Sequence, residues 1–199
     1  MEASNPKSEP KQPDLTRRDW ILAALAAFAE GGVEAVRIEP LAKNLGVSKG
    51  SFYWHFKDRA ALLDGLIELW NLDFTRAMID RVAPLESAAE RLRALARDVL
   101  ASTMYGVDSA MAEAALQAWA RMDPQVAARV RLIEEERVSY LASELALAGL
   151  PKRRAGAMAR TIYLALLGLY STRSYNPQLA DDACFIELVE LVLDQARNG

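Results

Sequence analysis

The sequence predicts an all-α protein with an N-terminal three-helix domain, a larger C-terminal helical bundle and about nine helices in total. Three observations favour this fold class. Apolar residues recur at spacings of three and four, no segment alternates with period two, and Gly or Pro separates the apolar runs. With 199 residues, 52% of them hydrophobic and 26% charged, the chain is long enough to bury a sizeable core.

The first four helices are placed by their caps and breakers. Asp14 or Thr16 can cap the first helix, a proline opens the second, Ser48 can cap the third and Asp58 the fourth. These signals predict helices from Thr16 to Gly31, from about Pro40 to Gly46, from Lys49 to about Phe56, and from Asp58 to Pro84.

Similar caps and helix breakers occur in the rest of the chain. Glycines or Asn-Pro close the apolar runs, and Asp123-Pro124 provides a cap followed by proline at the first helical position. The later helices are therefore predicted over Ser87–Tyr105, Ala110–Met122, Pro124–Ala148, Lys152–Tyr170 and Asp181–Arg197.

Composition excludes several classes of protein. Cys184 is the only cysteine, which excludes disulfide frameworks and cysteine-rich zinc sites, and we expect its thiol to be buried and unreactive. No apolar run approaches about 18 residues, so we expect no membrane span. Residues 1–14 are polar and proline-rich, which predicts a flexible tail rather than a secretory signal. We therefore expect a cytoplasmic protein.

Residues 41–56 are the part of the sequence that says most about local structure and function. Two short helices that meet at a steep angle need a small residue at their contact, which Ala42 provides, and Gly46 can adopt the positive φ of the turn. Val47 can fill the corner, and Ser48 can bond the free N–H groups of the next helix. This spacing predicts a helix-turn-helix.

The helix after this turn has two different faces. At about 100° per residue, Phe52 and Phe56 share one face, which we expect to be buried. The opposite face displays Gly50, Trp54 and Lys57. A basic cluster with a net +3 charge over residues 43–59 lies here, inside a chain whose net charge is -3. Outward aromatic residues beside lysines indicate a surface that contacts a flat, anionic partner.

Double-stranded DNA has these properties, because its major groove admits one α-helix while lysines and hydroxyls bind phosphates. We expect Lys49 to reach a phosphate or a guanine edge, and Gly50 to let the backbone approach closely. Tyr53 and His55 suit phosphate oxygens, and Trp54 suits a thymine methyl or a sugar. Lys57 and Arg59 would add positive charge. The alternative is a compact helical corner with an exposed basic face and no DNA partner.

The motif resembles the DNA-binding signature of the TetR family of transcriptional regulators. It covers about a quarter of the chain, roughly Thr16 to Leu63, and centres on Leu41-Ala-(x3)-Gly46-Val-Ser-Lys-Gly-Ser-Phe-Tyr-Trp-His-Phe56 followed by Asp58-Arg59. The resemblance implies a homodimer with a DNA-binding domain over 15–59 and a ligand-binding and dimerisation domain over 60–199. The DNA-binding residues that the resemblance implies are Ser48, Lys49, Gly50, Ser51, Tyr53, Trp54, His55 and Arg59, and we add Lys57 for its charge and Arg37 for the reason given next.

Arg37 departs from the family pattern. It stands where relatives often have Thr or Ser as the cap of the second helix, so that cap must come from elsewhere and Arg37 is free to reach a phosphate.

The resemblance also implies a central cavity for an unidentified small molecule. Methionine adapts to varied shapes, and Trp or Tyr combine apolar area with one polar group. The candidate ligand-binding residues on the surrounding helices are Met104, Tyr105, Trp119, Met122, Tyr140, Tyr163 and Tyr170. For each residue separately, the alternative is an ordinary core position.

The last two helices have more apolar surface than one buried face requires. Residues 183–196 hold apolar side chains around most of the helix, and residues 155–168 include Ala155, Ala159, Ala165 and Gly168, which allow close approach. We expect a two-fold dimer through these helices. The alternative is a monomer in which these residues fill a larger core.

No enzyme motif is present. The single histidine, His55, is assigned to the DNA-contacting helix, and the sequence has no phosphate loop, metal-spaced cluster or nucleophile elbow. We expect no catalytic residue, metal site or cofactor. The expected function is that of a repressor which binds a palindromic operator as a dimer and is released by a small molecule. The alternatives are a transcriptional activator or a helical adaptor with a protein partner.

Overall fold

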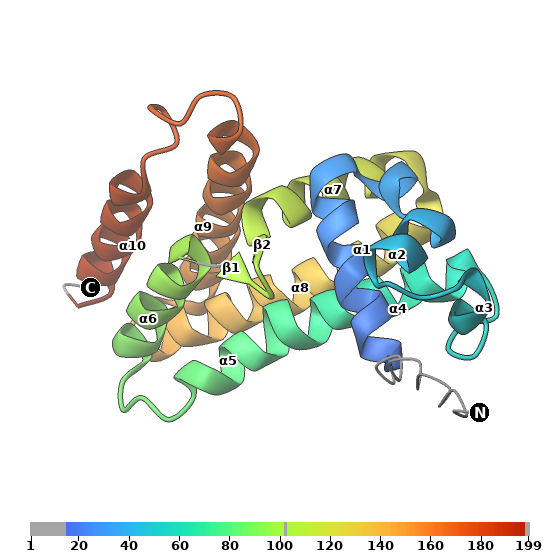
Figure 1. The fold of residues 1–199 in the computed structure, drawn as a ribbon. Coiled ribbons are helices and arrows are strands. Elements are labelled where there is room, and N and C mark those ends of the chain that lie inside the picture. Colours follow the sequence, from blue (N-terminus) through green and yellow to red (C-terminus); the bar gives the residue numbers. More distant parts are fainter. Residues whose placement is uncertain (1–14, 102, 198–199) are drawn as a thin grey trace, which may run out of the picture.

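The computed structural model describes residues 15–101 and 103–197 (Figure 1). Over these residues the chain is almost entirely helical, which confirms the predicted all-α class. The helices are α1 (Arg17–Gly31), α2 (Ile38–Asn44), α3 (Lys49–Phe52), α4 (Arg59–Asn71), α5 (Ala77–Val82), α6 (Ala88–Ala101), α7 (Ser109–Met122), α8 (Pro124–Leu147), α9 (Lys152–Arg173) and α10 (Asp182–Arg197). The tail predicted over residues 1–14 lies outside the described residues.

Two irregular turns interrupt this pattern. A 3₁₀ turn, η1 (Val33–Ala35), joins α1 to α2, and a π-helical turn, η2 (Leu72–Arg76), lies between α4 and α5. The chain stays helical from Arg59 through Val82, so α4, η2 and α5 form the single long helix that the sequence predicts. Counted this way, the described residues form nine helical segments.

Local capping explains the helix ends. At the start of α1 the Asp19 N–H donates to Thr16 Oγ1 at 3.3 Å, and the Thr16 N–H donates to Asp19 Oδ2 at 2.7 Å. The Thr16 hydroxyl also donates to Asp19 Oδ2 at 2.7 Å, and this hydrogen bond, together with that from the Thr16 N–H, lowers the pKa of Asp19. Asp58 caps α4 by accepting from the Ala61 N–H at 2.8 Å, and Asp123 caps α8 with Pro124 at the first helical position.

The prediction of one helix over Ser87–Tyr105 is wrong at its C-terminal end. The helix α6 ends at Ala101, and β1 (Thr103–Met104) pairs antiparallel with β2 (Val107–Asp108). Tyr105 and Gly106 form the turn with φ of 55° and 76°, which suits a two-residue hairpin. Glycine adopts positive φ readily, and the Tyr105 side chain is held by hydrogen bonds described below.

The third helix is also shorter than predicted. Regular α-helix ends at Phe52, and the backbone continues to Phe56 in tight turns, with the Trp54 N–H bonded to the Ser51 carbonyl at 3.3 Å. Ser48 occupies the cap position but makes no side-chain capping bond; its carbonyl accepts from the Ser51 N–H at 3.0 Å instead.

The buried apolar residues form two separate hydrophobic cores. One joins α1–α4 to α7 and the first half of α8, with Trp20, Phe28 and Trp70 fully or almost fully buried. The other joins α6, the end of α8, α9 and α10, with Leu145 and Leu193 at its centre. Figure 1 shows α1–α3 at one end of the protein and the α9–α10 pair at the other. No described helix is long and apolar enough to cross a membrane.

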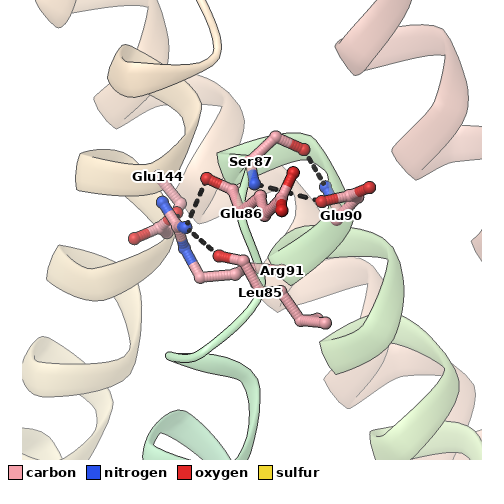
Figure 2. Close-up of polar contacts among 6 residues, drawn as sticks. All are labelled: Leu85, Glu86, Ser87, Glu90, Arg91 and Glu144. Carbon is pink, nitrogen blue, oxygen red and sulfur yellow. Dashed lines mark hydrogen bonds and ion pairs between the residues drawn. The ribbon is translucent and has the colours of Figure 1, made fainter.

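The connection between α5 and α6 is held by a polar cluster (Figure 2). The Arg91 guanidinium donates to Glu144 Oε2 of α8 at 2.8 Å and to the Leu85 carbonyl at 2.7 Å. Ser87 and Glu90 exchange side-chain and backbone hydrogen bonds at 3.1 Å, which caps α6. These contacts fix α6 against α8 and thereby position one wall of the cavity described next.

Candidate DNA-binding surface and ligand cavity

The turn between α2 and α3 has the geometry that the sequence predicts. Gly46 has a φ of 70°, and the Val47 N–H donates to the Ala42 carbonyl at 3.0 Å. Ala42 is buried where the two helices meet, and Val47 is half-buried in the corner. A non-glycine residue at Gly46 would strain this backbone.

A small aromatic cluster fixes the orientation of α3. Phe52 and Phe56 are buried, as predicted, and their rings stack with centroids 5.4 Å apart. Trp20 of α1 packs edge-on against Phe52 at 5.3 Å. Because Phe52 and Phe56 are anchored in the core, the opposite side of α3 must face away from the protein.

That opposite side exposes the predicted aromatic residues. Trp54 is 89% exposed and Tyr53 is 53% exposed, with the Tyr53 ring held edge-on against Phe52 at 5.3 Å. A Cβ added at Gly50 would meet only Ser48 Oγ, at an ordinary 3.5 Å. The fold itself therefore does not require glycine at this position. Of the remaining predicted residues here, Ser48 and Lys57 are exposed, and Ser51 and His55 are half-buried.

The cations of the predicted set differ in their partners. Lys49 forms an ion pair with Glu39 of α2, which raises the Lys49 pKa, and both side chains are exposed. Such an exposed pair contributes little to stability, so a phosphate could replace Glu39 as the partner. Arg37 is exposed and makes no capping bond to α2.

Arg59 has a structural role that the sequence did not predict. Its guanidinium donates to the Val36 carbonyl at 2.6 Å and to the Val33 carbonyl, and so closes the C-terminal end of η1. These contacts are partly buried. Arg59 therefore connects α4 to the α1–α2 junction, and its guanidinium is already engaged within the protein.

A largely apolar cavity lies within the helical body. It has a volume of about 80 Å³ and is partly open to solvent, so in this structure it suits only a small molecule. Its lining comes from the long α4–η2–α5 helix and from α6, α7, α8 and α9, and consists of Trp70, Phe74, Thr75, Met78, Ile79, Leu95, Val99, Ser109, Glu113, Arg137, Tyr140, Leu141, Tyr163 and Tyr170.

One wall of the cavity contains a buried ion pair. Arg137 Nη1 donates to Glu113 Oε2 at 2.9 Å and to Tyr163 Oη at 3.2 Å, and Arg137 Nε donates to Thr75 Oγ1 at 2.9 Å. The Glu113 side chain is 4% exposed and that of Arg137 is 15% exposed. Burial opposes the charge of Arg137, but Glu113 and Tyr163 outweigh it and raise the Arg137 pKa. Burial also raises the pKa of Tyr163.

Three buried polar atoms of the lining residues have no hydrogen-bond partner among the described residues. They are Ser109 Oγ, at the start of α7, Trp70 Nε1, at the end of α4, and the Tyr140 hydroxyl of α8. Buried polar atoms are normally paired, so these three atoms indicate where a bound molecule could place a polar group.

The structure brings together three of the seven predicted ligand-binding residues, namely Tyr140, Tyr163 and Tyr170. Trp119 and Met122 instead line a separate groove between η1, α4, α7 and α8. Met104 lies in the hairpin and packs against the first core, and Tyr105 is 47% exposed in the hairpin turn. Both were predicted on a helix that ends before them.

Sequence reasoning missed the ion pair at the cavity. Glu113 lies three residues from Ala110 and three from Leu116, which are both buried on α7. A single carboxylate on the apolar face of a helix is a signal for a buried partner. The sequence gives no comparable signal for its partner, because Arg137 lies 24 residues away on a helix with many charges.

A second polar cluster connects the cavity to α1. Asp73 of η2 accepts hydrogen bonds from Arg18 of α1 at 2.8 Å and from the Tyr105 hydroxyl at 2.6 Å. Arg18 also donates to the Tyr105 hydroxyl at 2.6 Å. The next two residues of η2, Phe74 and Thr75, line the cavity. Consecutive residues of one π-helical turn thus contact α1 on one side and line the cavity on the other.

The last two helices retain exposed apolar side chains. Leu164 of α9 and Leu191 of α10 are exposed, although both lie on helices that otherwise pack in the second core. Ala155 and Ala159 are buried within that core, so the expectation that they allow close approach of a second copy is wrong. Cys184 is exposed, which corrects the expectation of a buried thiol.

The arrangement of α1–α3 is that of a helix-turn-helix domain, in which the second helix of the motif faces outward from an aromatic core. A family model described as bacterial regulatory proteins, TetR family, matches residues 21–66. The HTH-type transcriptional regulator BetI of Cronobacter sakazakii is 31% identical over 170 residues, which cover 82% of each chain. The chain belongs to the TetR family.

Two further relatives support this assignment, one through the sequence of part of the chain and the other through its fold. The HTH-type transcriptional regulator AcrR of Shigella flexneri is 39% identical over 57 residues, 29% of this chain, and the matched part spans 25% of that relative. A TetR-family transcriptional regulator from a Rhodococcus species superposes with a TM-score of 0.70 at 25% identity, covering 89% of this chain and 98% of that one.

Proposed function

We propose that this protein is a cytoplasmic, ligand-responsive transcriptional repressor without catalytic activity, which binds a palindromic operator as a homodimer. Residues 15–59 form the DNA-binding domain, and residues 60–199 bind the effector and the second copy. The observation that carries this proposal is the orientation of α3: buried Phe52 and Phe56 force exposed Tyr53 and Trp54 outward beside lysines. A helix turned in this way suits a major groove.

The DNA contacts divide into two kinds. Lys49, Tyr53, His55 and Lys57 contact phosphates, which position the domain without reading sequence. The first turn of α3 and the Trp54 ring approach base edges and thymine methyl groups. Gly50 has no side chain, so the backbone of α3 can approach the DNA closely at this position. This accounts for a glycine at a position where the fold itself does not require one. Arg59 acts indirectly, because it holds the start of α4 against η1.

Dimerisation occurs through α9 and α10, where Leu164 and Leu191 supply apolar surface that the described residues leave exposed. This surface lies at the end of the protein opposite α1–α3 (Figure 1). A two-fold axis there would leave both DNA-binding domains free, and half-sites about one helical turn apart, or somewhat more, would suit a rigid dimer.

Effector binding reaches the DNA-binding domain through η2. A molecule in the cavity contacts Phe74 and Thr75, and any change in this turn displaces Asp73, whose carboxylate holds Arg18 of α1. π-Helical turns are frequent at functional sites and can convert to regular α-helix, which changes the register of the residues that follow. The effector thereby favours a state in which the domain no longer fits the operator.

Titration of the purified protein onto the DNA upstream of its own gene tests the regulator. We expect a specific complex whose logarithmic affinity falls linearly with the logarithm of salt concentration, because phosphate contacts release counterions. The control is a DNA fragment of equal length from within a coding region. Absence of a salt-sensitive complex on any intergenic fragment would contradict the proposed function.

The Asp73→Asn variant tests the connection through η2. The substitution weakens the charge-assisted hydrogen bond from Arg18, so we expect operator affinity to fall about tenfold and hydrogen exchange in the first turns of α1 to rise. Fluorescence anisotropy with labelled operator and hydrogen–deuterium exchange measure the two effects. Asp98→Asn is the matched control, since Asp98 also accepts from an arginine, Arg81, at 3.3 Å. Equal behaviour of the two variants would exclude this route.

A further inference from the structure

The chemistry of the cavity restricts the class of effector. We propose that the effector is a small, uncharged, mainly aromatic or aliphatic compound that carries at least one hydroxyl or carbonyl group. This inference rests on the proposed function, because it concerns the same cavity, and it adds the charge and the polar content of the molecule that binds there.

The charges of the cavity wall balance each other. Glu113 and Arg137 are the charged residues of the lining, they pair with each other at 2.9 Å, and Arg137 also donates to Thr75 and Tyr163. A carboxylate or an ammonium group brought into this site would add a third charge to a pair that is already neutral. Removing such a group from water is costly unless it is paired, so the site favours a neutral molecule.

The other walls of the cavity are apolar and include a flat aromatic surface. Trp70 and Phe74 stack with ring centroids 4.0 Å apart and present a flat aromatic surface. Met78, Ile79 and Leu95 supply aliphatic surface around it. A single-ring compound suits both the flat wall and the limited volume, because apolar burial supplies most of the affinity in sites of this kind.

Three buried polar atoms of the lining residues lack a partner among the described residues, namely Ser109 Oγ, Trp70 Nε1 and the Tyr140 hydroxyl. The two hydroxyls can donate or accept a hydrogen bond, and Trp70 Nε1 can only donate. An oxygen atom of a bound molecule would satisfy a donor that the described residues leave unpaired. This accounts for the hydroxyl or carbonyl group in the proposed effector.

Four compounds of one shape test the proposal. They are 4-ethylphenol, ethylbenzene, 4-ethylbenzoate and protonated 4-ethylbenzylamine, each titrated at pH 7 by calorimetry into the full chain. We expect 4-ethylphenol to bind, and to bind at least about tenfold more tightly than either charged compound. Binding of a charged compound with equal or higher affinity, or no binding of 4-ethylphenol at 1 mM or about that concentration, would overturn the proposal.

The Ser109→Ala variant tests the polar contact. It removes an unpaired buried hydroxyl, so the protein should remain folded. We expect its affinity for 4-ethylphenol to fall about tenfold and its affinity for ethylbenzene to stay unchanged. Ser143→Ala, at an exposed serine of α8, is the control. A uniform effect on both compounds, or no effect on either, would exclude Ser109 as the polar contact.

Operator binding separates the two proposals. If the protein binds operator DNA and only charged compounds release it, the class of effector is wrong and the regulator stands. If no operator complex forms in the absence of any compound, the proposed function itself is wrong.

Discussion

The double variant Tyr53→Phe/Trp54→Ala is expected to bind operator DNA about 100-fold more weakly than the unchanged protein. Trp54 is 89% exposed and Tyr53→Phe keeps the ring against Phe52, so the free energy of unfolding should change by less than about 0.5 kcal/mol. Fluorescence anisotropy measures the affinity, and urea denaturation measures stability. The large effect is expected because the proposed function places both side chains against DNA, while neither substitution removes a buried contact within the protein.

The control for this variant is Met122→Ala, which removes an exposed apolar side chain outside α3. Its operator affinity should stay within about twofold of that of the unchanged protein. Unchanged operator affinity in the double variant would contradict the assignment of α3 as the helix that contacts DNA, and it would favour the alternative of an exposed helical corner with no DNA partner.

The Glu113→Gln variant is expected to lose about 3 to 5 kcal/mol of unfolding free energy. The substitution keeps the shape of the side chain but leaves the positive charge of Arg137 in the cavity wall without its partner. The double variant Glu113→Leu/Arg137→Met should recover most of this loss, because it removes both charges and keeps apolar volume. Urea denaturation of both variants measures the effect.

An exposed ion pair, also between a glutamate and a basic residue, provides the comparison for the buried Glu113–Arg137 pair. Glu39→Gln breaks the exposed contact with Lys49, and we expect it to change the unfolding free energy by less than about 0.5 kcal/mol. A loss below about 1 kcal/mol in Glu113→Gln would show that water reaches Arg137 in solution. In that case the buried Glu113–Arg137 pair would no longer be a reason to expect an uncharged effector.

The DNA-binding domain could be predicted almost completely from the sequence, because its signals are local. Gly46 sets the turn, and Phe52 and Phe56 are one helical turn apart and therefore share a face. Trp54 then has to point outward. The shortness of α3 was missed, because tight turns bury the same two phenylalanines as a full helix would.

The cavity could be predicted only in part, because its contacts join residues that are distant in the sequence. Glu113 and Arg137 are 24 residues apart, and Arg137 and Thr75 are 62 apart. Helical periodicity places each on a face but does not select its partner. The hairpin was missed because each strand has only two residues, too few for a period of two to be visible.

Arg59 shows a different limit of sequence reasoning. Its position beside the basic cluster predicted a contact with DNA, but the carbonyls of Val33 and Val36 lie within reach once α1, η1 and α4 are packed. Backbone carbonyls are present at every residue and give no pattern in a sequence. Such partners can be identified only from coordinates.

The central claim is that the outward face of α3 reads DNA as one half of a symmetric pair. Selection of binding sites from a random duplex library, followed by footprinting of the enriched sequences, tests it most directly. We predict an inverted repeat whose half-sites are about one helical turn apart or somewhat more, protected by the unchanged protein and lost with Tyr53→Phe/Trp54→Ala. Enrichment of no symmetric sequence, or the same footprint with that variant, would contradict the claim.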